Sequence, residues 1–466
     1  MSVIIILFIT AILALYSGVL GTGKYSQPIS IMGLIIAFMG TFYGDFSFFE
    51  QYKFMFNFDH SAQIFTQISI ITTLLIFALG RFAFKLIDHH QAEIYSLLLF
   101  SLCGGIILFS FQNLVTLFLG IEILSIPLYV LAGSNKIDLR SNEASIKYFL
   151  MGAFATGFLL FGIALIYGTT GSFDISTIRQ YSINTLHFPT IYITGIILML
   201  VGLLFKISIA PFHFWAPDVY EGSPSLITAF MASVIKICGF VALYKLLEFV
   251  FVGQLNDWQY IIFYLAIITL LTANIIGVLQ RNAKRMLAYS SISHAGYLLL
   301  IYFNSDANSI YILAFYLLAY SLSTVGVFAS LIYIERVSHG MTDICMFNGL
   351  AKKQPILALT TTISLLSMAG IPLTSGFIAK FSLFTQTLKT QPILVIVAIL
   401  GSAISIAYYL KIIIAMYFNS EYKELTVAKK APFTYNLVAI IVIVLIIALG
   451  VYPEPLFNCL ELISLR

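Results

Sequence analysis

Long apolar runs recur along the whole 466-residue chain, and they constrain its fold more than any other feature. About fourteen of them are long enough to cross a bilayer as helices, which takes about 20 apolar residues. A β-barrel would show short alternating segments instead. With 60% hydrophobic and only 9% charged residues, the sequence predicts an all-α, polytopic membrane protein. The predicted spans cover residues 3–22, 29–43, 63–83, 92–111, 114–133, 146–168, 189–212, 225–247, 259–279, 286–303, 308–334, 355–385, 392–418 and 434–452.

The lysines and arginines give this topology an orientation, because cytoplasmic loops are enriched in both. With fourteen spans, 15 of the 24 basic residues fall in loops on one side, 5 on the other and 4 inside spans. The richer side is predicted to be cytoplasmic, which places both termini outside.

Two lysines, Lys206 and Lys236, lie within apolar sequence. A charge near the bilayer centre costs about 2.5–3.5 kcal/mol on insertion scales, so such residues usually have a function. Pro211 lies between them and should break its helix. A broken helix at membrane depth requires protein or water around the freed backbone. The combination indicates an ion or proton pathway.

A second proline-interrupted span suggests an internal repeat. The run at 355–385 breaks around Gly370-Ile371-Pro372 and carries Lys380. Interrupted spans at corresponding positions are typical of repeated halves around a central ion path. Because the two runs lie five spans apart, the halves should be inverted in the membrane.

Glu122 is the only acidic residue clearly inside a predicted span. It is either a protonated carboxyl that serves helix packing or the partner of Lys206. A carboxylate keeps a buried lysine protonated whereas desolvation opposes its charge. Lys206 could then gain and release a proton. Lys380 also has a structural interpretation, and Lys411 is near enough to a helix end to snorkel.

His213 follows the predicted break, and His294 lies among hydroxyl residues. Either could relay protons near neutral pH or be a hydrogen-bonded structural histidine. Asp218 and Glu221 are expected at a cytoplasmic helix end, as a proton entrance or merely as solvated charges.

No cofactor site is expected in this chain. The cysteines Cys103, Cys238, Cys345 and Cys459 are scattered, without a C-x-x-C motif. This spacing does not favour a disulfide framework, an iron–sulfur cluster or a zinc site. Residues 18–24 fit G-x-x-x-x-G-K, but Tyr25 follows where a phosphate-binding loop needs Ser or Thr, so nucleotide binding is not expected. No flavin motif appears, and no nucleic-acid partner is expected.

The segment LFKISIAPFHFWAPDVYEGSPSLITAFMASVIKICGF resembles the antiporter-like membrane subunits of respiratory complex I, and PDVYEG resembles its subunit N. GIEILSIPLYVL, AKRMLAYSSISHAGY and AGIPLTSGFIAKF extend the resemblance over about residues 110–415. It implies fourteen helices, two inverted five-helix repeats, and breaks in helices seven and twelve. The implied parts are 1–90 (helices 1–3), 91–250 (first repeat), 251–420 (second repeat) and 421–466 (helix 14).

The resemblance also implies roles for individual residues. Glu122 and Lys206 match the family's charged pair, Lys236 its central lysine and Lys380 its distal lysine. The chain is then expected to translocate protons in a bacterial inner membrane. Other complex I subunits would be its partners and would use NAD, quinone, flavin and iron–sulfur clusters. The alternatives are a subunit of a multi-subunit Na⁺/H⁺ antiporter, a stand-alone secondary transporter and a structural scaffold.

Overall fold

A computed structural model describes residues 2–43, 52–83, 90–185, 187–303, 309–420 and 431–464. Their regular structure is helical throughout, without a named strand, which confirms the predicted all-α class. Lys85, Lys423 and Lys429–430 of the topology argument, and both chain termini, lie outside these residues. The helices are α1 (Ser2–Val19), α2 (Ser26–Gly40), α3 (His60–Ala83), α4 (Gln91–Ser110), α5 (Leu114–Ala132), α6 (Leu139–Thr170), α7 (Ile175–Asn184), α8 (Thr190–Lys206), α9 (Trp215–Gly222), α10 (Ser225–Tyr244), α11 (Leu255–Leu279), α12 (Ala283–Leu298), α13 (Ser309–Val337), α14 (Leu350–Lys353), α15 (Pro355–Ala369), α16 (Ser375–Thr387), α17 (Pro392–Tyr417), α18 (Phe433–Val451) and α19 (Glu454–Ser464).

All fourteen predicted spans coincide with helices in the described part of the chain. Eleven helical segments are long and apolar enough to cross a membrane. The other three predicted spans correspond to shorter helices: α2 with 15 residues, α8 with 17 and α15 with 15. The last two stop early because they are the broken helices. The protein is therefore a multi-pass membrane protein.

Two matching backbone contacts reveal the inverted repeat. Isolated antiparallel bridges join Asn113 to Asp174 and Asn282 to Asp343, with the same 61-residue separation in each. Each asparagine side chain caps the helix that follows it, α5 or α12, by accepting hydrogen bonds from its first turn. Since α5 and α12 are five spans apart, they cross the membrane in opposite directions.

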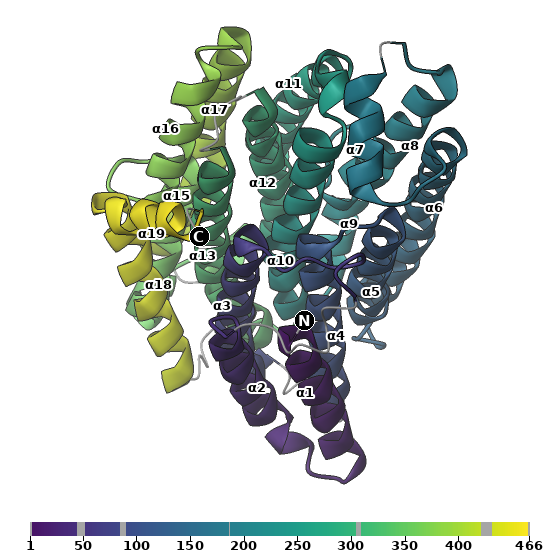
Figure 1. Ribbon diagram of the computed structural model, residues 1–466. Helices are drawn as coiled ribbons and strands as arrows, with labels where there is room; N and C mark the ends of the chain where they lie inside the picture. The colour runs from purple at the N-terminus through teal and green to yellow at the C-terminus, as the bar shows by residue number, and fades with distance from the viewer. Residues whose placement is uncertain are drawn as a thin grey trace.

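The interior of the bundle is formed by α10, α12 and α13, which lie between the two groups of outer helices in Figure 1. The most apolar windows of α10 and α12 are completely buried, whereas those of α1, α6 and α18 are one-third buried. A charged group on a helix that is buried on all sides is costly unless it is paired or hydrogen-bonded. A lysine on α10 therefore depends on partners from neighbouring helices.

Candidate functional site: two broken helices and their lysines

The sequence predicted a break at Pro211. The first broken helix ends five residues earlier, at Lys206. Ser208 adopts a left-handed backbone with φ of 58°. Proline has no N–H and its ring excludes the carbonyl four residues earlier, which here belongs to Ile207. The break therefore lies one turn ahead of the proline, and the Ile207 carbonyl loses its helical partner.

Lys236 supplies the missing donor. Its Nζ donates a hydrogen bond to the Ile207 carbonyl from the middle of α10, and the residue is only 2% exposed. Close packing of α10 on the break makes this contact possible. A Cβ on Gly239 would lie 2.3 Å from Cγ2 of Ile207, so only glycine allows the approach.

Lys206 is held by aromatic side chains. Its Nζ donates to the Tyr129 hydroxyl at 2.7 Å and lies 4.9 Å from the centroid of that ring. Tyr148 packs edge-on against Tyr129 and stacks on Trp215, with centroids 4.5 Å apart. Such rings stabilise a desolvated cation through their quadrupoles.

Glu122 is not joined to Lys206 in the described residues. No ion pair within 4.0 Å is recorded between them, and Glu122 Oε1 is buried without a hydrogen-bond partner. A buried unpartnered carboxylate oxygen is costly unless water or a proton satisfies it. The predicted Glu122–Lys206 pairing therefore stays a prediction, and Tyr129 is the partner that the geometry provides.

The second broken helix ends at Ala369, where the sequence placed it. Gly370 follows in the left-handed region with φ of 86°. Lys380 Nζ donates to the Ala369 carbonyl at 3.2 Å and to Ser402 Oγ at 3.0 Å. The ammonium also lies 4.5 Å from the centroid of the Tyr297 ring. Lys380 is 5% exposed.

His294 lies on α12 of the second half, near enough to Lys380 and to Lys236 of the first half for both charges to act on it. Its Nδ1 lies 2.9 Å from the Tyr316 hydroxyl and its Nε2 lies 3.5 Å from that of Tyr409. The hydroxyl surroundings that the sequence suggested are thus present. Since one ring nitrogen accepts while the other donates, His294 can hand a proton across its ring.

His213 is separate from this group. It follows the first break, is 6% exposed and stacks on Phe214. Its Nδ1 is buried and has no hydrogen-bond partner among the described residues. The structure therefore brings His294 to the buried lysines and leaves the relay role of His213 a prediction.

The model of the NADH:quinone oxidoreductase/Mrp antiporter transmembrane family matches residues 111–405. This stretch contains both breaks and the charged residues Glu122, Lys206, Lys236 and Lys380. This chain belongs to that family. The NADH-quinone oxidoreductase subunit N of Flavobacterium psychrophilum is 42% identical over 99% of this chain and 100% of that protein. The same subunit of Cytophaga hutchinsonii is 40% identical over 98% of this chain and 99% of that protein. The predicted resemblance is confirmed.

Solved structures of the family share the fold. A chain of respiratory complex I from Thermus thermophilus with bound aureothin is 30% identical, with a TM-score of 0.81, over 98% of this chain and 99% of that chain. A chain of the Mrp complex from Dietzia sp. DQ12-45-1b has a TM-score of 0.83 at 19% identity, over 100% of this chain and 97% of that chain. The second likeness speaks for the fold alone.

Ion pairs connect the two halves of this family member where α9 meets α12. Asp218 accepts from Arg285 at 2.6 Å and from Lys147 at 2.9 Å. Lys147 also forms an i, i+4 ion pair with Glu143, at 2.6 Å. Burial raises the pKa of Asp218, but the two hydrogen bonds outweigh it and hold the pKa below its usual range. These groups border a cavity of about 250 Å³ together with Glu221. Glu221 also accepts from Arg285, at 3.1 Å, so both acidic residues are paired.

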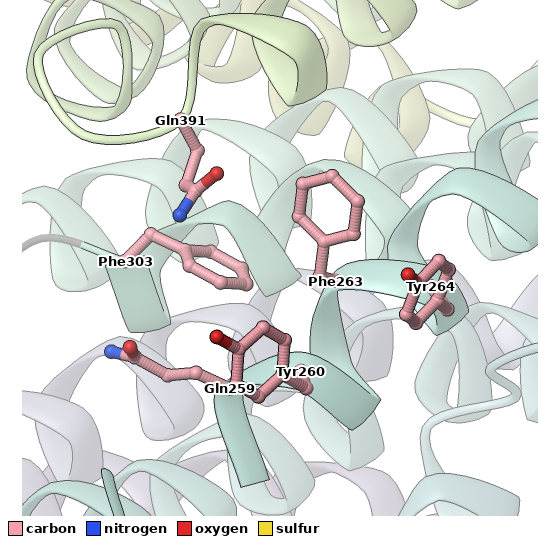
Figure 2. Close-up of a pocket in the computed structure, with 6 residues that line it drawn as sticks. All are labelled: Gln259, Tyr260, Phe263, Tyr264, Phe303 and Gln391. Atoms are coloured by element: carbon pink, nitrogen blue, oxygen red, sulfur yellow. The ribbon is translucent and has the colours of Figure 1, made fainter. Parts of the chain in front are cut away.

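An open pocket of about 230 Å³ lies toward the other end of α12. Figure 2 shows its lining of four aromatic side chains and two glutamines, with Gln391 approaching from the α16–α17 connection. None of the lining residues is charged, so this pocket has no carboxylate or amine to exchange protons with the buried lysines. The lining residues are Gln259, Tyr260, Phe263, Tyr264, Phe303 and Gln391.

Sequence reasoning missed three features. Tyr129 and Ser402 bind the lysines of the broken helices, but their sequence neighbourhoods resemble any apolar span. Glu248 lies one residue beyond a predicted span, yet it belongs to a π-helical turn, η4 (Lys245–Val250), that prolongs α10. Its Oε1 is buried without a hydrogen-bond partner, so Glu122 is not the only carboxylate within the helical bundle.

No group of three or more His, Cys, Asp or Glu residues that could hold a metal ion occurs among the residues the structure describes.

Proposed function

We propose that this chain is the subunit-N-type proton-translocating module of a bacterial NADH-quinone oxidoreductase. The observation that carries the proposal is the pair of broken helices whose freed carbonyls bind buried lysines. Its support from the comparisons is the near full-length similarity to NADH-quinone oxidoreductase subunit N. Other subunits of the complex would bind NAD and quinone and hold flavin and iron–sulfur clusters, and this chain would hold no redox centre.

In this proposal the buried lysines carry protons along the middle of the membrane. Lys206 gives its proton through water to Lys236, which lies close to the same break. His294 passes it across the interface between the halves, and Lys380 receives it at the second break. Each lysine is ionisable, buried and held by a hydrogen bond that a neutral amine forms more weakly.

Glu122 would act as the modulator of this sequence. When its carboxylate is charged and near Lys206, that lysine keeps its proton. When the carboxylate is protonated or moves away, the proton leaves toward Lys236. The unpartnered Oε1 of Glu122 supports this role, because no hydrogen bond from the described residues fixes that oxygen in place.

The proposal further places the chain in the bacterial inner membrane, with lipid around its outer helices, water between the buried lysines and both termini in the periplasm. The exposed apolar side chains of α1, α6 and α18 support contact with lipid. The position of the ion-pair cluster supports the orientation, because its arginines and lysines belong to the basic side of the topology.

Lys236→Ala tests the proposal in native membranes after assembly of the complex has been verified. We expect proton pumping to fall by about 100-fold, a usual loss for a missing proton-transfer group, together with the coupled quinone reduction. Lys411→Ala is the matched control, because this exposed lysine also donates to a helix carbonyl, that of Val278. Unchanged pumping in Lys236→Ala would reject the scheme.

The same measurements separate the alternatives. A Na⁺/H⁺ antiporter subunit predicts that Lys236→Ala abolishes sodium resistance and spares NADH-driven pumping. A stand-alone transporter predicts transport by the purified chain in vesicles. A scaffold predicts that the variant changes stability alone.

A further inference from the structure

Ser402 at the second break corresponds in position to Lys236 at the first break. The first broken helix is followed by α10, and the second by α17. Lys236 donates from α10 to the Ile207 carbonyl, and Ser402 donates from α17 to the Ala369 carbonyl at 3.0 Å. In both halves of the inverted repeat, a side chain of the following helix therefore donates a hydrogen bond to the freed carbonyl.

The second break differs because three groups meet there. Lys380 Nζ lies 3.0 Å from Ser402 Oγ and 3.2 Å from the Ala369 carbonyl, while Ser402 also reaches that carbonyl. The serine is half-buried and the lysine is buried. The Lys380 ammonium, the Ser402 hydroxyl and the Ala369 carbonyl therefore form a triangle in which each group is hydrogen-bonded to the other two.

A hydroxyl can reverse its hydrogen bonds, whereas a carbonyl cannot. When Lys380 is an ammonium, Ser402 accepts one of its N–H groups and donates to Ala369. When the proton has left for water, the amine has a lone pair. Ser402 can then donate to that lone pair while the amine donates to Ala369. All three polar groups stay satisfied in both states, with no movement of heavy atoms.

We propose that Ser402 is a positioning residue that keeps Lys380 at the second break in both of its protonation states. The proposal rests on the proton-translocating function proposed above. Lys380 then keeps one position whether it is charged or neutral. Lys236 donates to a carbonyl, so its hydrogen bond is strongest when the lysine is charged.

The titratable groups that face Lys380 come from α12. They are Tyr297, over whose ring the ammonium lies, and His294, on which the charge of Lys380 acts. No carboxylate lies within 4.0 Å of Lys380 among the described residues. Tyrosines of the other packed helices contact other groups. Tyr316 and Tyr320 of α13 contact His294, Tyr408 and Tyr409 of α17 contact Asn274 and Ser290, and Tyr435 of α18 donates to the Leu79 carbonyl.

Ser402→Ala in the assembled complex tests the proposal through the pH profile of proton pumping. Hydrogen bonds to charged groups are stronger than those to neutral ones, so the loss weakens the ammonium form more. We expect the alkaline limb of the profile to move to lower pH by about half to one unit. Ser402→Thr keeps the hydroxyl and should restore the limb. Ser405→Ala is the matched control, since its hydroxyl donates to the Ser402 backbone carbonyl within the same helix.

An unmoved alkaline limb in Ser402→Ala, with assembly intact, would overturn the proposal, as would an equal shift in Ser405→Ala. If Ser402→Ala does not assemble, Ser402→Cys keeps the side-chain volume with a much weaker hydrogen-bonding group and should show the same shift. Lys236→Ala separates the two proposals. If it abolishes pumping while Ser402→Ala leaves the limb in place, only the role of Ser402 is wrong. If Lys236→Ala pumps normally, the proposed function itself fails.

Discussion

The two helix breaks share a backbone design and differ in their chemistry. At each break a residue in the left-handed region, Ser208 or Gly370, ends the helix. The carbonyl just before it, Ile207 or Ala369, is bound by a donor from another element. The first carbonyl binds one lysine, whereas the second also binds the serine of α17.

This difference shows what an inverted repeat preserves. The repeat fixes where the backbone is opened and which helix follows, because those features stabilise a broken helix within lipid. It leaves free the side chain that fills the opening. The lysine that binds the freed carbonyl therefore lies on the helix after the break in one half, at Lys236, and within the broken helix in the other half, at Lys380.

The close packing of Gly239 against Ile207 allows a substitution that displaces the first break and leaves the second unchanged. In Gly239→Ala, the new Cβ would lie 2.3 Å from Cγ2 of Ile207, so α10 or the break must move. Overpacking of this kind costs about 1–3 kcal/mol, and the bond from Lys236 to the Ile207 carbonyl should lengthen. We expect proton pumping to fall about tenfold or more, measured in membranes with equal amounts of assembled complex.

Gly157→Ala is the control for that experiment. This glycine also lies within a spanning helix, α6, and a Cβ there meets nothing within 4 Å. Its pumping should equal that of the native protein. Normal pumping in Gly239→Ala would mean that the first break tolerates displacement of α10 and that the close approach has no functional weight.

A hydroxyl also holds the lysine of the first broken helix, which makes Tyr129 the counterpart of Ser402. Tyr129→Phe removes the hydrogen bond at 2.7 Å from Lys206 and keeps the ring that attracts the ammonium. A hydrogen bond to a charged group contributes about 1.5–3 kcal/mol, part of which the ring retains. We expect pumping to fall about threefold to tenfold, measured as the initial rate of proton uptake by inverted vesicles.

Tyr167→Phe serves as the comparison, because this partly exposed tyrosine of α6 stacks on Phe173, away from the buried lysines. If both variants pump equally, the Lys206–Tyr129 bond is a packing contact, and the parallel between the two broken helices is limited to their backbones.

Much of this fold follows from the sequence because its signals are local. Apolar runs give the spans, and Pro211 and Pro372 each mark a break. Burial of Lys236 is expected because no helix end lies near enough for this lysine to snorkel. The exact ends of the broken helices are harder to predict from the sequence. The first helix ends five residues before Pro211, because the proline excludes the Ile207 carbonyl from the helix.

The partners of the lysines could not be predicted from the sequence, because they are distant along the chain. Tyr129 reaches Lys206 across 77 positions and Lys236 reaches Ile207 across 29. Ser402 and Ser405 both lie in the same apolar run, and only the folded chain shows that one binds a lysine and the other a backbone carbonyl. The pairing of Glu122 with Lys206 was expected from their opposite charges and from the family resemblance, and neither gives a distance between the two side chains.

The left-handed residues provide the smallest and most specific test of the comparison. Gly370 adopts its positive φ without strain, whereas Ser208 has a Cβ that crowds the backbone at φ of 58°. Its buried Oγ has no hydrogen-bond partner among the described residues. Ser208→Gly should raise the free energy of unfolding by about 1 kcal/mol, because it removes the strain and the orphaned hydroxyl and loses some chain entropy. The measurement is the apparent melting temperature of the purified protein in detergent.

Ser208→Ala distinguishes the two contributions, because it removes the hydroxyl and keeps the Cβ. Greater stability in glycine than in alanine would show that the backbone is strained at the first break and relaxed at the second. If glycine and alanine stabilise equally, the orphaned hydroxyl alone is responsible. A loss of stability in both would mean that water satisfies the hydroxyl. The first break would then be hydrated beside Lys206 and Lys236, as proton transfer between them requires.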